Sequence, residues 1–211
     1  MSFSNNANFI TFEGIDGCGK STQARMLLDV LNKTHSIETI LVREPGGTTI
    51  SESIREILLH SNRGELGDRS ESLLMTASRA QLTQDVIIPN LELGKCVIAD
   101  RYSDSTLAYQ GGGRGIDIDW LIDLNNYATF ALVPDITFLI DIRPEEALRR
   151  LDQSTDRIEG EGIEFQVRVR KTYHDLAEKF QDRYVLLDGH SNIDYLQEKL
   201  LNEMKRRGII S

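Results

Sequence analysis

Short runs of apolar, mostly β-branched residues alternate along the chain with longer segments in which apolar residues recur every three or four positions. The short runs have the length of buried strands, and the periodic segments are typical of amphipathic helices. This alternation predicts an α/β fold, in which helices cover both faces of a parallel sheet. The five strands are expected at residues 8–13, 38–43, 96–100, 135–141 and 184–188.

The first two helices are predicted directly after the first two strands. The apolar positions that we expect to face the core are Ala24, Leu27, Leu28 and Leu31 in the first helix, and Ile50, Ile54, Ile57 and Leu58 in the second. Further helices are predicted at residues 70–84, 117–127, 164–181 and 193–207, and turn-rich loops at 61–67, 111–115 and 154–162. No repeat or linker-like tract divides the chain, so residues 1–211 are expected to form a single domain.

Composition and charge narrow the classes of protein. Hydrophobic residues make up 40% of the chain, which excludes a disordered protein. The 33 acidic and 24 basic side chains give a net charge of -9, and this excess repels a phosphate backbone. Nucleic acid is therefore not expected as a partner.

Compartment and redox state follow from two further observations. No apolar run approaches the ~18 residues that a transmembrane helix needs, and the N-terminal MSFSNNAN has neither a basic start nor an apolar core. We therefore expect a cytoplasmic protein that does not bind membranes. Cys18 and Cys96 both lie beside strand-like segments, so free thiols are expected.

The strongest motif lies between the first predicted strand and the first predicted helix. Residues 14–21, GIDGCGKS, match the phosphate-binding pattern GxxxxGK[S/T] at every fixed position. Glycines allow backbone N–H groups to converge on phosphate oxygens, while Lys20 brings positive charge and Ser21 a hydroxyl for magnesium. The alternative is a glycine turn that only joins a strand to a helix. The residues assigned to nucleotide binding are Gly14, Ile15, Asp16, Gly17, Cys18, Gly19, Lys20, Ser21 and Thr22.

Two polar clusters follow later strands. Arg43 begins the segment REPGGT after the second strand, while Asp100 and Arg101 end the third strand and precede YSDSTLAYQGGGRG. In an open parallel sheet, the ligand crevice lies at the carboxyl ends of the strands. An acid at this place suits magnesium binding through water, and an adjacent arginine can reach a phosphate. A solvated arginine and a surface ion pair are the alternatives from these residues alone.

A third cluster lies within a predicted helix. Met75 and Arg79 are four residues apart in LLMTASRAQ, so they share one helix face. An apolar side chain one turn from a guanidinium group can hold a nucleobase. The alternative is a core methionine beside an arginine that reaches outwards to solvent.

Together, the motifs FEGIDGCGKST, REPGGT, LLMTASRAQ, DRYSDSTLAYQGGGRG and DRIE resemble those of thymidylate kinases in order and spacing. Members of that family phosphorylate dTMP with ATP. The resemblance implies the three-layer fold of P-loop nucleoside monophosphate kinases, with a five-stranded parallel sheet, a mobile lid and a homodimer. It also implies Mg²⁺ near Ser21 and Asp100, and a cis peptide bond at Glu44–Pro45.

The resemblance assigns roles around the acceptor phosphate and the sugar. Asp16 matches the carboxylate that accepts a hydrogen bond from the deoxyribose 3′-hydroxyl. Arg43 and Arg101 match the arginines that hold the dTMP phosphate, and Asp100 matches the acid near magnesium. Tyr109 matches the ring that crowds a ribose 2′-position and thereby favours deoxynucleotides.

The resemblance also assigns the base site. Arg79 and Gln110 match side chains that hydrogen-bond the edges of thymine, and Ser105 and Thr106 are expected to line the same pocket. The family usually has phenylalanine where this chain has Met75, so a thioether contact replaces stacking on the base. This departure is therefore expected to affect the affinity for the base or the stringency for dTMP.

The expected lid covers residues 149–164. Family members whose phosphate loop lacks an arginine carry their catalytic arginine in the lid, and the loop of this chain has none. Arg157 in the segment DRIE is the first candidate for this catalytic residue and Arg150 the second. Both also fit a solvated basic helix face.

The expected chemistry agrees with this assignment, and two rival functions remain as alternatives. A phosphate acceptor is largely dianionic at neutral pH and needs no general base, and the four histidines lie outside every motif. A deoxynucleoside kinase is the rival enzyme, but it must activate a neutral hydroxyl. A nucleotide-dependent switch or silent binder is the rival from another class, although the guanine-reading segment NKxD of GTPases is absent.

Overall fold

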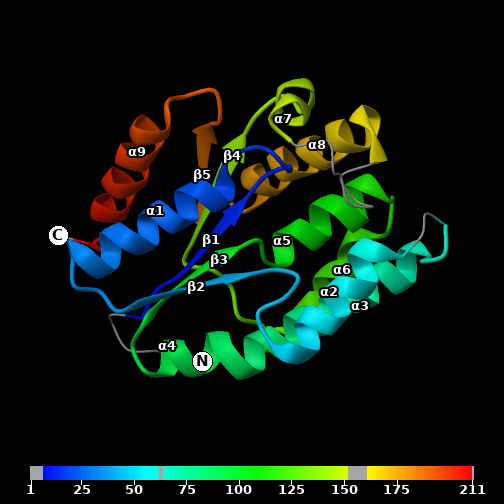
Figure 1. The fold of residues 1–211 in the computed structure, drawn as a ribbon, viewed down its shortest axis with the longest axis horizontal. Coiled ribbons are helices and arrows are strands. Elements are labelled where there is room, and N and C mark those ends of the chain that lie inside the picture. Colours follow the sequence, from blue (N-terminus) through cyan, green and yellow to red (C-terminus); the bar gives the residue numbers. More distant parts are fainter. Residues whose placement is uncertain (1–6, 62–63, 152–160, 211) are drawn as a thin grey trace.

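A five-stranded parallel sheet forms the centre of the computed structural model, which describes residues 7–61, 64–151 and 161–210 (Figure 1). The strand order is β2-β3-β1-β4-β5. The strands are β1 (Phe9–Glu13), β2 (Thr39–Arg43), β3 (Cys96–Asp100), β4 (Ile136–Asp141) and β5 (Tyr184–Asp188). Each begins and ends within one residue of its predicted bounds, so the α/β fold and all five predicted strands are confirmed.

Helices cover both faces of this sheet (Figure 1). On one face lie α1 (Lys20–Lys33) and α9 (Ile193–Arg206), and on the other lie α4 (Ile88–Glu92), α5 (Ser103–Thr106) and α8 (Ile163–Lys179). Beyond this second layer, α2 (Thr49–His60), α3 (Asp68–Leu82) and α6 (Ile118–Ala128) pack beside one another. The remaining elements are the π-helical turns η1 (Thr83–Ile87) and η2 (Leu107–Gly113), and α7 (Pro144–Arg150).

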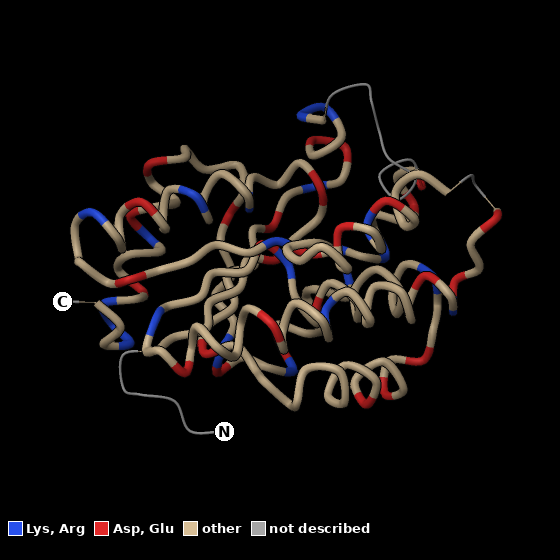
Figure 2. Tube along the Cα trace, turned by 60° about the horizontal axis from the view of Figure 1, so that its bottom comes forward, with Lys and Arg blue, Asp and Glu red and all other residues tan. Residues whose placement is uncertain are grey.

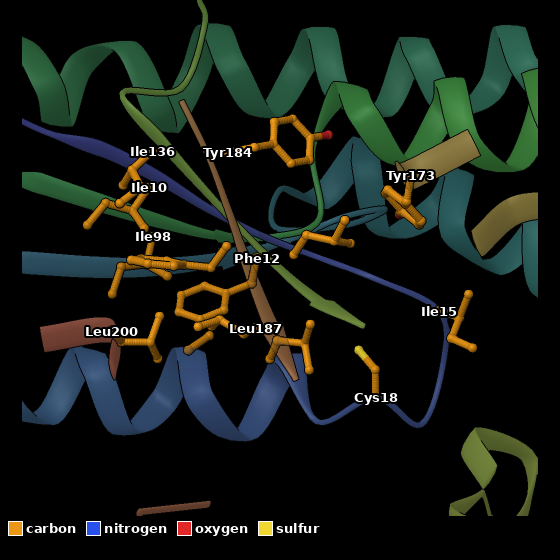
Figure 3. Packing of buried hydrophobic residues seen from close by; sticks show 14 of the residues in the cluster. Ile10, Phe12, Ile15, Cys18, Ile98, Ile136, Tyr173, Tyr184, Leu187 and Leu200 are labelled. Atoms are coloured by element: carbon orange, nitrogen blue, oxygen red, sulfur yellow. The ribbon is translucent and has the colours of Figure 1, made fainter. Parts of the chain in front are cut away.

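Side chains of the central strands alternate between two packed layers. Ile10 and Phe12 of β1 and Ile98 of β3 point towards α1 and α9, where Leu200 meets them (Figure 3). The intervening side chains belong to a second cluster, which includes Phe9, Val97, Ala99, Leu82, Ile87 and Leu91. Because both faces of β1 and β3 are buried, these strands read as continuous apolar runs, as central parallel strands do.

The predicted core face of the second helix is partly wrong. Leu58 of α2 is fully buried, whereas Ile50 is 55% exposed and Ile57 is 49% exposed. The reason is that α2 packs against α3 and not flat on the sheet, so only one edge of its apolar face is covered. The corresponding prediction for α1 is confirmed, since Ala24, Leu27 and Leu31 are buried and Leu28 packs against them.

The glycine-rich segment expected as a loop at residues 111–115 is partly helical. Gly111, Gly112 and Gly113 complete η2, which packs against α8. A Cβ atom at Gly112 would collide with Thr172, and one at Gly113 would collide with the ring of Phe165. Gly112 and Gly113 therefore allow the close approach of α8. A glycine-rich composition does not distinguish this packing role from a loop.

The distribution of charge, the state of the two thiols and the character of the helices complete the description of the fold. Lys and Arg are interspersed with Asp and Glu along the trace (Figure 2). Cys18 and Cys96 are free and buried, as predicted. Among the helices that the structure describes, none has the length and apolar character required to cross a bilayer.

Candidate active site

The phosphate-binding motif forms the turn between β1 and α1. Gly14, Gly17 and Gly19 all have positive φ values, of 138°, 80° and 100°. Side chains are excluded at two of them, because a Cβ at Gly14 would lie 2.5 Å from the carbonyl oxygen of Ile140 and one at Gly17 would collide with Ala147. Gly19 caps α1 without any side-chain bond to its first amides. Those amides are thus available to an anion at the helix N-terminus.

The side chain of Ile15 anchors the phosphate-binding loop to the hydrophobic core. Its side chain is buried in the main hydrophobic cluster, as is that of Cys18. The carbonyl oxygen of Ile15 accepts a hydrogen bond from Cys18 N at 3.3 Å, which closes the turn. Burial raises the pKa of the Cys18 thiol. Both side chains anchor the loop to the core, so only their backbone atoms remain for nucleotide binding.

Two cavities adjoin this loop. The first has a volume of about 230 Å³ and lies at the carboxyl ends of β1, β2 and β3. Its lining consists of Asp16, Lys20, Ser21, Arg25, Arg43, Glu44, Pro45, Arg55, Leu59, Met75, Arg79, Asp100, Arg101, Ser105, Thr106, Tyr109 and Gln110. Every residue that the sequence assigned to substrate or metal binding is in this set. Six cationic side chains face three acidic ones, which suits an anionic ligand.

Asp16 forms the centre of the polar contacts in the first cavity. Its Oδ1 accepts hydrogen bonds from Arg101 Nη2 at 2.6 Å and from Lys20 Nζ at 3.2 Å. Its Oδ2 accepts one from the Tyr109 hydroxyl at 2.9 Å. Although burial opposes the effect, Arg101 and Lys20 hold the pKa of this carboxyl group well below its usual range. Asp16 is therefore a fixed negative charge within the phosphate loop.

Arg101 is held in one orientation from several sides. Its backbone has a φ of 75°, unusual for a residue with a side chain, directly after β3. Its Nη1 donates to Ser105 Oγ at 3.0 Å, and its guanidinium lies 4.8 Å from the centre of the Tyr109 ring. The arginine is thus preorganised at the cavity wall with little freedom left to lose on binding.

Glu13 supports this arrangement from beneath the cavity. Its Oε2 accepts hydrogen bonds from Ser105 Oγ at 2.6 Å and from the Tyr173 hydroxyl at 2.8 Å. Burial, and next the nearby Asp104, raises the pKa of Glu13 to about 7. Glu13 was not predicted as a site residue, because an acid that ends a strand just before the phosphate loop carries no separate signal in the sequence.

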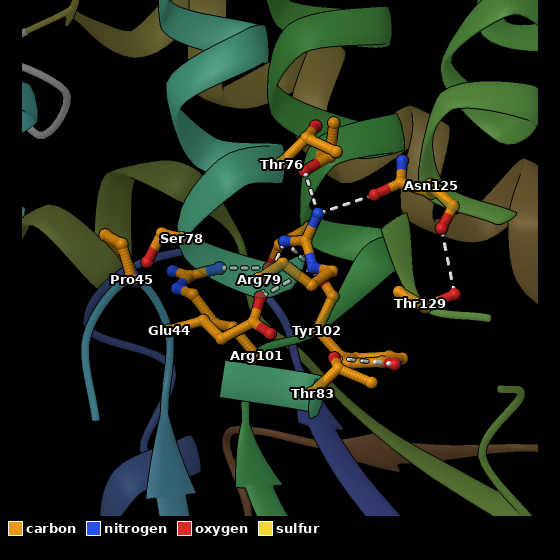
Figure 4. A network of polar contacts seen from close by, with 12 residues as sticks. Glu44, Pro45, Thr76, Ser78, Arg79, Thr83, Arg101, Tyr102, Asn125 and Thr129 are labelled. Carbon is orange, nitrogen blue, oxygen red and sulfur yellow. Dashed lines mark hydrogen bonds and ion pairs between the residues drawn. The ribbon is translucent and has the colours of Figure 1, made fainter. Parts of the chain in front are cut away.

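Arg79 is buried and bonded to the surrounding scaffold (Figure 4). It donates from Nε to Glu44 Oε2 at 2.7 Å, from Nη1 to Thr106 Oγ1 at 2.8 Å and Asn125 Oδ1 at 2.6 Å, and from Nη2 to the carbonyl oxygen of Tyr102 at 3.0 Å. Nη2 also forms an ion pair with Glu44 at 2.7 Å, so every nitrogen of the guanidinium has a partner. A contact with a base edge therefore requires one of these donors to turn to the ligand.

The turn after β2 places two arginines at the cavity edge. The peptide bond Glu44–Pro45 is cis, as expected. Arg55 Nη1 donates to the carbonyl oxygen of Pro45 at 2.8 Å. Arg43 Nη2 donates to both carboxylate oxygens of Glu52 at 3.0 Å. Arg43 was predicted from the sequence, whereas Arg55 was not, because its helix contains no recognisable motif.

Arg25 is a further cationic residue that sequence reasoning missed. It lines the first cavity one helical turn after Ser21. The signal that would have found it is the i, i+4 spacing from the phosphate-loop serine, which places both residues on the same face of α1.

The second cavity lies on the other side of the loop and has a volume of about 870 Å³. Its lining comprises Gly17, Cys18, Gly19, Lys20, Ser21, Thr22, Gln23, Arg150, Gly189, Ser191, Asn192, Ile193, Asp194 and Leu196. Arg150 Nη2 donates to the carbonyl oxygen of Gly189 at 3.1 Å, so the end of α7 is tied to the turn after β5. Arg157, the first lid candidate, lies outside the described residues, and so does most of the expected lid.

Ser21 and Asp100 are the two residues expected to hold magnesium. Ser21 and Asp100 line the same cavity, and Asp100 Oδ1 is buried and has no hydrogen-bond partner within residues 7–61, 64–151 and 161–210. No cluster of three or more metal-binding side chains occurs among the described residues. Mg²⁺ does not require one, because it keeps several waters and is held by one or two protein groups together with substrate phosphates. The two residues fit such an ion.

Comparison with known proteins agrees with the geometry. The sequence model of the family described as thymidylate kinase matches residues 12–200. The thymidylate kinase of Chlorobium phaeobacteroides is 44% identical over 209 residues, covering 94% of each chain. That of Thermosipho africanus is 49% identical over 187 residues, covering 88% of this chain and 92% of the relative.

A solved structure gives the same result. The crystal structure of thymidylate kinase from Ehrlichia chaffeensis aligns with a TM-score of 0.80 at 34% identity, covering 94% of this chain and 99% of that one. The resemblance drawn from the five motifs is thus confirmed by sequence and by fold. The chain belongs to the thymidylate kinase family.

Proposed function

We propose that the first cavity binds dTMP and the second binds ATP, with the phosphate-binding loop between them. Membership of the family makes the chain an enzyme that transfers a phosphoryl group from ATP to dTMP, giving dTDP and ADP in the synthesis of dTTP. Lys20 and Ser21 line both cavities, which supports their position where the two ligands meet. The observation that carries the assignment is the bond from Arg101 to Asp16, which joins the loop to the cationic wall of the first cavity.

The acceptor phosphate is assigned to the cationic part of the first cavity. Arg101 is fixed by its bonds to Asp16 and Ser105, and its Nη groups also donate to Tyr109 and Tyr173. Its charge is therefore in place for a phosphate, which binds at Nε or replaces one of these contacts. Arg43 contacts the same phosphate from the end of β2, exchanging its pairing with Glu52 for the ligand. Arg25 and Arg55 add charge around this position.

The sugar and the base occupy the remainder of the first cavity. Asp16 accepts a hydrogen bond from the 3′-hydroxyl, and the buried ring of Tyr109 crowds the 2′-position. Met75 lies against the thymine ring, with Gln110 and Arg79 at its polar edges. Ser105 and Thr106 also line this cavity.

Ser21 and, through water, Asp100 would hold Mg²⁺, and the Asp100 Oδ1, which has no partner among the described residues, supports this role. When bound, the ion offsets negative charge on the phosphate oxygens. Lys20 supplies positive charge to the transferring group, and Arg157 or Arg150 supplies a further charge from the lid region. The dTMP phosphate is itself the nucleophile and is already dianionic, so the chain needs no general base.

An assay with four acceptors tests this function. ADP release is measured with Mg-ATP and dTMP, dUMP, dGMP or thymidine. We expect the highest kcat/KM with dTMP, because Arg43 and Arg101 require an acceptor phosphate and the base site requires a pyrimidine. Turnover of thymidine or dGMP without turnover of dTMP would overturn the proposal.

We also propose that the chain forms a homodimer through α2 and α3. Ile50 and Ile57 on α2 and Leu73 on α3 are all about half exposed, and the two helices pack side by side. Apolar side chains gathered on an outer surface are typical of subunit interfaces. Light scattering should give twice the chain mass, and Ile57→Glu should reduce it towards that of one chain.

The remaining proposals concern organisation and location. Residues 1–211 are taken as one domain, which is supported by a single sheet whose strands come from the whole chain. A cytoplasmic location is supported by two free cysteines, since cytoplasmic thiols stay reduced. Interspersed charges of both signs support a protein that uses neither nucleic acid nor a membrane as a partner.

A further inference from the structure

Glu71 is a buried carboxylate directly behind the lining of the first cavity. It lies in α3, one turn before Met75, and is 0% exposed. Its Oε1 accepts a hydrogen bond from Gln110 Nε2 at 2.8 Å. Gln110 is itself buried and lines the cavity. The carboxylate thus contacts a cavity-lining amide from behind.

Arg114 keeps this carboxylate in place. Its Nη2 donates to Glu71 Oε2 at 3.1 Å and its Nε donates to Glu71 Oε1 at 3.2 Å. Arg114 is fixed in turn by an ion pair with Glu161 at 2.6 Å and by its position 4.8 Å from the centre of the Phe165 ring. The guanidinium therefore balances the charge of Glu71 and leaves it as an acceptor of hydrogen bonds.

The orientation of the Gln110 amide follows from this chemistry. An ionised carboxylate only accepts hydrogen bonds, so it must face the NH₂ group of the amide. Turning the amide over would replace this hydrogen bond by a contact between two acceptors, the Gln110 carbonyl oxygen and the buried carboxylate, which Arg114 still contacts from its other side. The carbonyl oxygen Oε1 is then the end of the amide that remains for a ligand.

We propose that Glu71 is a positioning residue for base selection, because it fixes Gln110 with its carbonyl oxygen as the acceptor offered to the base. The inference rests on the proposed contact between Gln110 and the base. Thymine and uracil carry an N–H at position 3 that can donate to this oxygen. Cytosine carries a bare nitrogen acceptor there, which faces the same oxygen without a proton between them. Glu71 thereby favours dTMP and dUMP over dCMP.

The test compares Glu71→Gln with the wild-type enzyme on dTMP, dUMP and dCMP. A glutamine at this position can donate as well as accept, so Gln110 is free to turn over and offer its NH₂ group to cytosine. We expect the ratio of kcat/KM for dTMP over dCMP to fall at least about tenfold. The ratio for dTMP over dUMP should stay within about twofold, because both bases donate from N3. A purely structural defect would lower all three activities together.

Asp68→Asn is the matched control. Asp68 also pairs with Arg114, at 3.6 Å, but is largely exposed and makes no bond to Gln110. The same change of acid to amide at the same arginine should leave the dTMP/dCMP ratio within about twofold. An unchanged ratio in a folded Glu71→Gln enzyme would overturn the proposal.

A reciprocal variant covers the case in which Glu71→Gln does not fold. Glu71→Gln combined with Gln110→Glu keeps the charge and the hydrogen bond of the pair, and it still presents an acceptor to the cavity. This double variant should retain discrimination against dCMP, and a loss of discrimination in the folded protein would contradict the inference. Gln110→Leu separates the two proposals. If it leaves kcat/KM for dTMP unchanged, the base contact of Gln110 is wrong. If it lowers that value while Glu71→Gln leaves the ratio unaltered, only the role of Glu71 is wrong.

Discussion

Arg101 Nη2 donates to Asp16 Oδ1 at 2.6 Å, which joins the carboxyl ends of β3 and β1 across 85 positions of sequence. The same Oδ1 accepts from Lys20, so a single carboxylate aligns a cation of the phosphate loop with a cation of the substrate wall. If the ligands bind as proposed, both cations are already aligned for the transferring phosphoryl group before any ligand binds.

Lys20→Ala should lower kcat at least about hundredfold, because the side chain supplies charge to the transferring group. The fold should persist, since Lys20 begins a helix whose core contacts come from other residues. Lys33→Ala is the matched control, a lysine at the exposed end of the same helix. Steady-state kinetics and a thermal melt decide the outcome. If Lys20→Ala keeps most of its turnover, the phosphate loop does not act in the transfer step.

Much of this site was predictable from sequence because parallel strands end at a common edge. Arg43, Asp100 and Arg101 follow two neighbouring strands, and the phosphate loop follows a third. The apolar runs predict the strands, and a parallel arrangement of these strands places all of these residues at one edge of the sheet. Their contacts with Asp16 and Ser105 depend on side-chain geometry, which the spacing does not specify.

The supporting residues were not predictable for a physical reason. Glu13, Glu71 and Asn125 are single polar residues within otherwise ordinary strands or helices. Their partners lie far away in sequence, as in the bond between Tyr173 and Glu13 across 160 positions. Such pairs depend on how helices pack against one another, whereas hydrophobic periodicity specifies only which face of each helix is inside. For the same reason, periodicity did not reveal that part of the apolar face of α2 is exposed.

Met75→Phe should lower KM for dTMP by about two- to tenfold, because an aromatic ring stacks on a base more favourably than a thioether does. The KM for ATP should not change, since Met75 lines only the first of the two cavities. Initial rates at varied dTMP and saturating ATP provide the measurement. A higher KM for dTMP would mean that the cavity has no room for the ring and that methionine is required by packing.

Replacing the two lid arginines should separate chemistry from binding. Arg157→Ala should lower kcat and kcat/KM for dTMP by similar factors, about a thousandfold, if its charge acts chiefly in the transition state. Arg150→Ala should instead raise KM for ATP, because it removes the bond to Gly189 beside the second cavity. The opposite pattern would make Arg150 the catalytic arginine. If neither change affects kcat by more than a few-fold, Lys20 and Arg101 supply the protein's charge without the lid.

The contribution of Glu13 to the free energy of unfolding should decrease as the pH rises. A carboxylate in an ordinary ion pair has a lowered pKa, and its contribution increases with pH. Burial, and next Asp104, raises the pKa of Glu13 from 4.5 to about 7, against the opposing effect of Arg101. The folded state therefore binds the proton more tightly than the unfolded state, and this contribution to stability is complete below about pH 4.5. It is lost as the pH rises through 7.

Glu13→Gln should remove this dependence. Between pH 5 and pH 8, the free energy of unfolding of the wild type should fall more steeply than that of the variant, as measured by urea denaturation at each pH. Glu56→Gln, the same substitution at an exposed position of α2, should follow the wild type. Parallel profiles for wild type and Glu13→Gln would mean that Glu13 is already ionised at pH 5. In that case the hydrogen bonds from Ser105 and Tyr173, together with the charge of Arg101, outweigh the effect of burial.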